Sequence, residues 1–359
     1  MNNIYVTKTF LPPQEEYNAI LKEAWNSNWI TNRGVLVKRL EEQLKDYLNV
    51  PNILLTTNGT LPLQIAIKAL DLKGEIITTP FSYVATTSAI VWEGCTPVFV
   101  DIHPEYLTID ETKIEAAITS KTSAILATHV YGNPCAVEEI EIIAKKYNLK
   151  VIYDAAHCFG VTYKGKSIFQ YGDVSTCSFH ATKIFHTGEG GALFCNDKEL
   201  YDKLYYMHNF GHDGPERFHG LGINAKMSEL QAAMGLAVLP YVSKIREERE
   251  KVVTYYKENI DNNTVKFLKF RTQTSPNHSY FPVVFTNEKM LNTAMKNLNK
   301  IQIFTRRYFY PSLNSLNYVE TKHLPIAQEV SLKVLCLPCS SDIDFSMLAK
   351  LTEIVNAVE

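Results

Sequence analysis

The sequence Ser178-Phe-His-Ala-Thr-Lys-Ile-Phe-His-Thr-Gly-Glu-Gly-Gly191 lies between two short apolar runs, Val174–Phe179 and Ala192–Cys195, that are typical of buried strands. Lys183 stands in the middle of this stretch, with apolar neighbours and glycines downstream. Lysine is rarely buried without a partner. A desolvated lysine has a lowered pKa, which an amine that forms a Schiff base requires. A surface lysine on a loop explains the stretch equally well, so the rest of the chain must decide.

Upstream of this stretch, strand-like apolar runs alternate with helical patterns. We expect strands at 52–57, 75–79, 96–101, 123–129 and 149–154, and helical segments at 14–27, 35–48, up to 70, 83–92, from about 110, and 137–147. This alternation predicts an α/β fold with a buried, largely parallel sheet. Such sheets bind ligands outside the carboxyl ends of their strands, so the polar residues that end these runs are candidates for a site.

The last third of the chain has a different pattern. A long helix is expected from Ser228 through Arg249, with a bend at Pro240. Helix and strand patterns follow from about Lys251, including a strand over 280–285. We therefore predict a large α/β domain over 1–245 and a small α+β domain over 246–359.

Composition excludes several classes of protein. The 359 residues are 46% hydrophobic and 21% charged, with a formal net charge of −2, which gives no sign of nucleic-acid binding. The N-terminus lacks a signal-peptide pattern, and no apolar run approaches the roughly 20 residues of a membrane span. We expect a soluble, cytoplasmic protein. Its seven cysteines should be reduced thiols, with a zinc or redox role for the C-x-x-C pair a minor alternative; they are Cys95, Cys135, Cys158, Cys177, Cys195, Cys336 and Cys339.

Two polar motifs follow predicted strands. Asn58-Gly59-Thr60 precedes a helix, where the glycine permits close backbone approach and the helix start favours an anion such as phosphate. A plain helix cap is the more common use of such residues. Asp154 ends the most apolar strand, where its carboxylate needs a partner. Asp154 is a candidate to hold a protonated pyridine nitrogen, to cap a helix or to bind Mg²⁺.

Two further residues complete a coherent set. Ser178 places a hydroxyl at a strand end, and Tyr83 offers an aromatic face that can cover a planar ring, although each alone is better explained by a structural role. An anion cradle, an aromatic face, a carboxylate and a lysine are together the groups that hold pyridoxal phosphate. The combination therefore predicts this cofactor, with Lys183 as the amine that binds it and moves the proton.

On these motifs the chain resembles the nucleotide-sugar aminotransferases of the DegT/DnrJ/StrS type, which depend on pyridoxal phosphate. The likeness runs through nearly the whole length. It rests on the order and spacing of nine segments: Asn58–Thr60, Thr79–Thr86, Pro97–Ile102, His129–Pro134, Tyr153–His157, Ser178–Lys183, Gly188–Gly191, Gly222–Asn224 and Ser228–Ala233.

The resemblance implies the fold of aspartate aminotransferase (fold type I), with a large mixed-sheet α/β domain and a smaller α+β C-terminal domain. It implies that Lys183 is the Schiff-base lysine, that Asp154 pairs with the pyridine nitrogen and that His157 contacts the phenolic oxygen of the cofactor. The remaining matches are Tyr83 as the stacking aromatic, phosphate-binding positions at Asn58, Gly59, Thr60 and Ser178, and Asn224, which would reach a phosphate in the neighbouring subunit of a homodimer.

Two features of the family pattern concern single positions. Relatives with histidine in place of the lysine are dehydratases, so Lys183 disfavours that activity. Lys226 departs from the pattern, since many members have arginine there.

The segment Ile303–Leu313 bears on the substrate. Arg306, Arg307 and Tyr308 are candidates to bind a diphosphate and a sugar or base, although a strand end with exposed arginines is an equal alternative. The segment resembles that of enzymes making dTDP-4-amino-4,6-dideoxy-D-glucose for cell-surface polysaccharides such as O-antigen. We therefore expect amino transfer from L-glutamate to a dTDP-4-keto-6-deoxyhexose.

Three alternatives stay open from the sequence. The first is amination at C3 of a 3-keto sugar. The second is a pyridoxal-phosphate-binding regulator without turnover, although such proteins usually carry a DNA-binding region, of which no sign is visible. The third is a nucleotide-binding enzyme without this cofactor, which would leave Lys183 unexplained and lacks a Gly-x-Gly-x-x-Gly motif.

Overall fold

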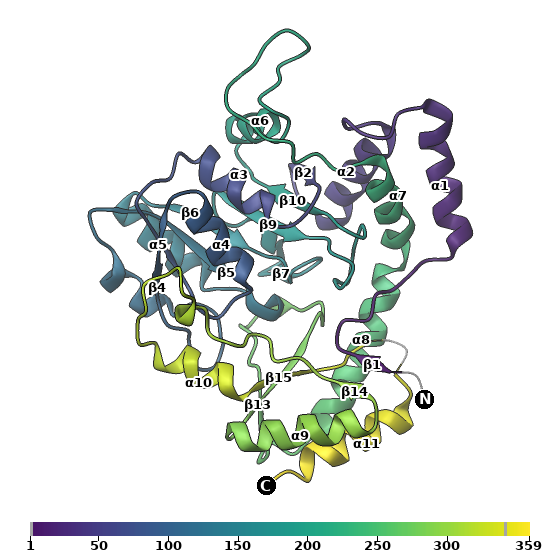
Figure 1. Ribbon diagram of the computed structural model, residues 1–359, viewed down its shortest axis with the longest axis vertical. Coiled ribbons are helices and arrows are strands. Elements are labelled where there is room, and N and C mark those ends of the chain that lie inside the picture. Colours follow the sequence, from purple (N-terminus) through teal and green to yellow (C-terminus); the bar gives the residue numbers. More distant parts are fainter. Residues whose placement is uncertain (1–2, 341–342) are drawn as a thin grey trace.

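The computed structural model describes residues 3–340 and 343–359, and its centre is a mixed sheet (Figure 1). All of its strands run the same way except β10, which is antiparallel to both of its neighbours. This confirms the mixed sheet of the predicted fold. Along the sheet, the order is β2 (Ile53–Thr56), β10 (Gly191–Phe194), β9 (Val174–Ser178), β6 (Lys150–Asp154), β5 (Thr122–Thr128), β3 (Glu75–Thr78) and β4 (Thr96–Phe99).

Helices cover both faces of this sheet, because successive strand residues point to opposite sides. On one side, Leu55 and Ile77 pack in a cluster with buried residues of α2 (Val35–Leu48), α5 (Val137–Tyr147) and α7 (Glu229–Val238). On the other side, their neighbours Leu54 and Ile76 pack with α3 (Leu61–Ala69), α4 (Val84–Trp92) and α6 (Lys198–Met207). The strands are therefore buried on both faces and largely apolar, and the polar residues at their ends are left to form a site.

The predicted long helix is present and is interrupted where expected. Ser228 caps α7, and a single 3₁₀ turn at Leu239–Tyr241 contains Pro240. Helix α8 (Val242–Asn259) then continues beyond the expected end at Arg249. Helix α1 (Gln14–Ser27) lies beside α7 (Figure 1).

The C-terminal part has its own antiparallel sheet, with the order β11 (Val265–Phe267), β13 (Phe281–Phe285) and β15 (Val334–Leu337). A second hydrophobic core joins this sheet to α9 (Glu288–Lys300) and α11 (Phe345–Asn356). Helix α10 (Pro325–Lys333) follows the segment with the two arginines. Because α8 runs across positions 245 and 246, the division into two domains there stays a prediction.

Short strands tie distant segments together. Strand β1 (Ile4–Tyr5) pairs with β14 (Ile303–Phe304), and β12 (Thr274–Ser275) pairs with β7 (Thr162–Tyr163), which also pairs with β8 (Lys166–Ser167). The N-terminal and C-terminal thirds of the chain are thus attached to each other and to the central part.

One element was predicted wrongly. The helix expected from about Asp110 is only two 3₁₀ turns, Glu111–Lys113 and Glu115–Ala117. Asp110 accepts hydrogen bonds from the backbone N–H and the hydroxyl of Thr112, and this local turn competes with helix formation. Helix α6, capped by Asp197, was not predicted.

All seven cysteines are buried free thiols, as expected. Burial raises the pKa of Cys336 and Cys339, which keeps both protonated. Among residues 3–340 and 343–359, no three metal-ligating side chains gather in one place. In the same part of the chain, no helix has the length and apolarity needed for a bilayer crossing.

Candidate active site

A cavity of about 300 Å³ opens where β6 and β9 end, and most of the predicted site residues line it. These are Asn58, Gly59, Thr60, Tyr83, Asp154, His157, Ser178, Lys183, Arg306 and Tyr308. They come from the starts of α3 and α4, from two strand ends, from the loop between β9 and β10 and from the segment after β14. The fold thus gathers groups that are up to 250 positions apart (Asn58 to Tyr308).

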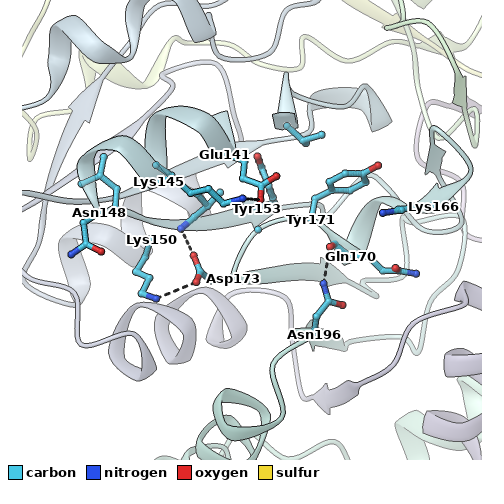
Figure 2. A pocket seen from close by; sticks show the side chains of 15 residues that line it. Glu141, Lys145, Asn148, Lys150, Tyr153, Lys166, Gln170, Tyr171, Asp173 and Asn196 are labelled. Carbon is cyan, nitrogen blue, oxygen red and sulfur yellow. Dashed lines mark hydrogen bonds and ion pairs between the residues drawn. The ribbon is translucent and has the colours of Figure 1, made fainter. Parts of the chain in front are cut away.

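A larger hollow of about 630 Å³ lies beside α5 and the starts of β6 and β9, and none of the predicted site residues lines it (Figure 2). Four of its charged side chains form ion pairs, Lys145 with Glu141 and Lys150 with Asp173 at 3.3 Å. The chemistry expected from the sequence therefore concerns the smaller cavity.

Lys183 lies in a loop whose backbone is fixed by hydrogen bonds. Its own N–H donates to the carbonyl of His180 at 2.9 Å, and Ala181 and Gly188 are joined at 2.7 Å. The buried Ile184 and Phe185 anchor the loop in the main core. The lysine Nζ reaches the Tyr280 hydroxyl at 3.4 Å. Burial lowers the pKa of Lys183, which favours the neutral amine that a Schiff base needs.

Asp154 is buried at the end of β6 and is held in place by two donors. Its Oδ2 accepts from the Thr86 hydroxyl at 2.6 Å, and its Oδ1 accepts from the N–H of Ala156 at 3.1 Å. Ser82 supports Thr86 from behind at 2.8 Å. Burial raises the pKa of Asp154. Within the described residues no cation forms an ion pair with this carboxylate, so a cationic N–H in the cavity would supply the missing partner.

His157 presents one defined ring nitrogen to the cavity. Its Nδ1 accepts from the backbone N–H of Tyr131 at 3.0 Å, so in the neutral ring the proton is on Nε2. Burial lowers the pKa of His157 far below its usual value, and the nearby Lys183 charge acts in the same direction. The ring is parallel to that of Phe309, with centroids 5.8 Å apart. His157 is therefore a neutral donor fixed in an aromatic wall.

The segment Asn58-Gly59-Thr60 has the capping role that the sequence suggested, and it lines the cavity, where anion binding stays a prediction. The Asn58 side chain accepts from the N–H groups of Thr60 and Leu61 at 2.9 and 3.0 Å, so it caps the start of α3. A Cβ at Gly59 would lie 2.7 Å from the Cβ of Ser178, so only glycine permits this approach. This close approach brings the segment of Thr60 next to that of Ser178, and both residues line the cavity.

Two predicted residues lie outside the cavity lining. The Arg307 guanidinium binds Glu288 at 2.9 Å and the carbonyl of Leu332 at 3.0 Å, which is a structural role. The Asn224 side chain accepts from Lys226 at 2.8 Å. Its predicted contact concerns a neighbouring subunit and stays a prediction.

Sequence reasoning missed several cavity residues. Tyr280 and Phe309 bring aromatic rings from the C-terminal part, while His180 and Glu189 flank Lys183 in its own loop. His180 and Glu189 lie at the two ends of the quoted motif, and their Nε2 and Oε1 are 3.5 Å apart. Thr86 was within reach of sequence reasoning, since it follows Tyr83 by one helical turn.

The cavity fits pyridoxal phosphate, the cofactor that the sequence predicts. The helix start and two hydroxyls suit a phosphate group, and the buried carboxylate of Asp154 suits a protonated ring nitrogen. The fixed Nε2–H of His157 suits an anionic oxygen on the ring, and Lys183 suits an aldehyde. Each of these groups on the wall thus has a matching group on the cofactor.

Comparisons with known proteins agree with this chemistry. A family model described as the DegT/DnrJ/EryC1/StrS aminotransferase family matches residues 13–359. A dTDP-4-amino-4,6-dideoxy-D-glucose transaminase of Shigella dysenteriae is 41% identical over 99% of both chains, and one of Escherichia coli is 38% identical over 98% of both. The crystal structure of DesI in the presence of its TDP-sugar product superimposes with a TM-score of 0.93 at 31% identity, covering 99% of this chain and 93% of that one.

Proposed function

The chain belongs to the DegT/DnrJ/EryC1/StrS aminotransferase family, and we propose that it transfers the amino group of L-glutamate to the C4 ketone of dTDP-4-keto-6-deoxy-D-glucose. The product would be dTDP-4-amino-4,6-dideoxy-D-glucose, for which the two similar transaminases are named. The observation that carries the proposal is the convergence of Lys183, Asp154 and His157 on one cavity. Together they would bind the aldehyde, the ring nitrogen and the ring oxygen of pyridoxal phosphate.

Pyridoxal phosphate, when bound, supplies an aldehyde that takes up an amino group and a ring that accepts electrons. Gly59, Thr60 and Ser178 would hold its phosphate, Tyr83 would cover its ring, and Asp154 would keep its ring nitrogen protonated. Asn58 contributes by capping the helix that carries the phosphate-binding N–H groups.

Lys183 would move the proton in both half-reactions. Burial lowers its pKa, which favours the neutral amine that can accept a proton. His157 would donate its Nε2–H to the ring oxygen of the cofactor, because Nδ1 is held by the Tyr131 N–H. Arg306 and Tyr308 lie at the same cavity and would bind the nucleotide sugar, whereas Arg307 is withdrawn from this role by its contact with Glu288.

The proposal has three further parts. The protein forms a homodimer in which Asn224 reaches the neighbouring subunit, it is cytoplasmic, and its product is used in cell-surface polysaccharides. The homodimer is supported by the match of Gly222–Asn224 to the family pattern and by the placement of Asn224, which lies outside the cavity of its own chain.

The test is a reaction of the purified protein with pyridoxal phosphate, L-glutamate and dTDP-4-keto-6-deoxy-D-glucose. We expect 2-oxoglutarate and the 4-amino sugar, identified by mass spectrometry and NMR, with ping-pong kinetics. L-aspartate and L-glutamine are the control donors. Lys183→Ala should retain the cavity and lose turnover.

A second arm tests the position of amination. The 3-keto isomer replaces the 4-keto sugar under the same conditions. Amination of the 3-keto isomer with no reaction of the 4-keto sugar would overturn the C4 assignment, and failure of the protein to bind pyridoxal phosphate would overturn the proposed function altogether.

A further inference from the structure

Gln231 lies in the first turn of α7, outside the cavity lining, and connects two segments of the cavity wall. Its Nε2 donates to the carbonyl oxygen of Thr57 at 3.0 Å and to that of Glu189 at 2.7 Å. Thr57 directly precedes Asn58-Gly59-Thr60, and Glu189 is in the loop that carries Lys183. One side-chain amide therefore joins the anion cradle to the lysine loop.

The other half of the same amide is engaged as well. Its Oε1 accepts from the backbone N–H of Ser228 at 2.9 Å and from the Ser228 hydroxyl at 3.0 Å. The two hydrogens of Nε2 and the two acceptor positions of Oε1 are thus all used, so the amide has a single orientation. Ser228 in turn accepts from the Gln231 N–H at 3.2 Å, which completes a capping box.

The connection is rigid because its surroundings leave no room for adjustment. The Thr57 N–H donates to the carbonyl of Ala225 at 2.8 Å, and the Thr187 hydroxyl donates to the same Glu189 carbonyl at 2.7 Å. A Cβ at Gly191 would lie 2.4 Å from the carbonyl oxygen of Asn58. The two wall segments are therefore in direct contact, and Gln231 on α7 links them by one hydrogen bond to each.

We propose that Gln231 is a positioning residue that fixes the distance between the anion cradle and the Lys183 loop, and thereby sets the affinity for the phosphate group of pyridoxal phosphate. This rests on the proposed function. Glutamine is suited to the task because it donates to two carbonyls while it accepts from the helix cap. A glutamate of the same shape would accept from the cap but would repel both carbonyl oxygens.

Gln231→Glu therefore keeps the contact with Ser228 and loses the contacts with the two carbonyls, whereas Gln231→Met removes all of them. Dissociation constants of the apo-protein are measured by absorbance titration with pyridoxal phosphate and with pyridoxal, which lacks the phosphate. We expect Gln231→Glu to weaken pyridoxal phosphate by roughly 10- to 100-fold, since two hydrogen bonds that shape the cradle are lost. Pyridoxal should change less than 3-fold, because the cradle does not hold it.

Gln328→Glu is the matched control. Gln328 lies in the first turn of α10 and accepts from the Leu324 N–H at 3.0 Å, so it also caps a helix, but it does not line the cavity. This variant should bind both compounds like the wild type. Circular dichroism of each apo-protein shows that the fold is retained, and Gln231→Met provides a second variant if Gln231→Glu does not fold.

Unchanged binding of pyridoxal phosphate in a folded Gln231 variant would overturn the proposal, as would equal weakening of pyridoxal and pyridoxal phosphate. A wild-type protein that binds neither compound would instead overturn the proposed function, and this inference with it.

Discussion

The Tyr280 hydroxyl accepts a hydrogen bond from the Lys183 Nζ at 3.4 Å, and this nitrogen lies 5.7 Å from the centre of the tyrosine ring. Tyr280 directly precedes β13 in the C-terminal part, whereas Lys183 belongs to the central part. Burial raises the pKa of Tyr280, so the phenol keeps its proton and does not act as a base. Its effect on the lysine is to orient Nζ.

Tyr280→Phe should lower kcat about 5-fold with little change in the KM of either substrate. The reason is that the ring is retained while the hydrogen bond that orients Nζ, worth about 1 kcal/mol, is lost. Steady-state kinetics with both substrates measure the split. The control is Tyr256→Phe, which removes a buried hydroxyl that donates to the Pro338 carbonyl at 2.7 Å, away from the cavity. Equal kcat values for Tyr280→Phe and the wild type would contradict the orienting role.

Asp154→Asn should separate stability from activity. The buried carboxylate has a raised pKa, so an amide of the same shape avoids the cost of burying a charge, and the apo-protein should be as stable as the wild type or about 1 kcal/mol more stable. The enzyme loaded with cofactor should lose at least about 100-fold in kcat/KM, since the partner of the ring nitrogen is lost.

Thermal unfolding of both apo-proteins and kinetics of both loaded enzymes test this prediction. Thr86→Val should cause a smaller loss of activity in the same direction, because it removes only the donor at 2.6 Å from Asp154. An Asp154→Asn variant that is much less stable as apo-protein and fully active would show that the carboxylate is structural.

The central fold was predictable because its signals are local, whereas Lys183 was singled out only together with polar residues elsewhere in the chain. Buried parallel strands are short apolar runs, and the residues that end them, such as Asp154 and Ser178, gather at one edge by the geometry of the sheet. Tyr280 and Phe309 were not predictable in this way. Tyr280 precedes a strand of the antiparallel C-terminal sheet, and Phe309 lies in the segment after β14. Neither position belongs to the common edge at which the parallel strands end.

Neighbouring arginines show a second limit of sequence reasoning. Arg306 forms a bridge with Cys336, and in such extended backbone successive side chains point in opposite directions. Arg306 therefore lines the cavity, while Arg307 faces Glu288. Both arginines were predicted as site residues, because the sequence does not reveal which of two successive side chains faces the ligand.

The two arginines should respond oppositely to the same substitution. Arg306 has an exposed side chain at the cavity and contacts the Tyr308 ring at 5.5 Å, so Arg306→Met should raise the KM of the nucleotide sugar roughly 10-fold or more and leave the free energy of unfolding unchanged. Arg307→Met should leave this KM unchanged and cost about 1–2 kcal/mol of stability, because it breaks the contacts with Glu288 and the Leu332 carbonyl.

Steady-state kinetics and urea unfolding of both variants provide the comparison, with each variant serving as the control of the other. A rise in KM with Arg307→Met, or no rise with Arg306→Met, would contradict the assignment of Arg306 to the substrate.

His129 should make the protein sensitive to acid. Its Nδ1 accepts from the Cys135 N–H at 2.9 Å and its ring stacks on Tyr153 at 4.4 Å. Burial, assisted by the charge of Arg271, lowers the pKa of His129 from 6.5 to about 3. His129 therefore binds a proton below pH 6.5 in the unfolded chain, but only below about pH 3 in the folded chain. Stability from this group is complete above pH 6.5 and is lost as the pH falls, by about 2 kcal/mol at pH 5.

His129→Asn tests this linkage, because the asparagine Oδ1 can still accept from the Cys135 N–H but does not titrate. The variant should be less stable at pH 7, since the ring stacking is lost, yet its free energy of unfolding should fall less between pH 7 and pH 5 than that of the wild type. Urea unfolding at half-unit steps gives both slopes, and the lowered pKa of His208 contributes equally to each. Parallel slopes for the two proteins would show that another group causes the acid sensitivity.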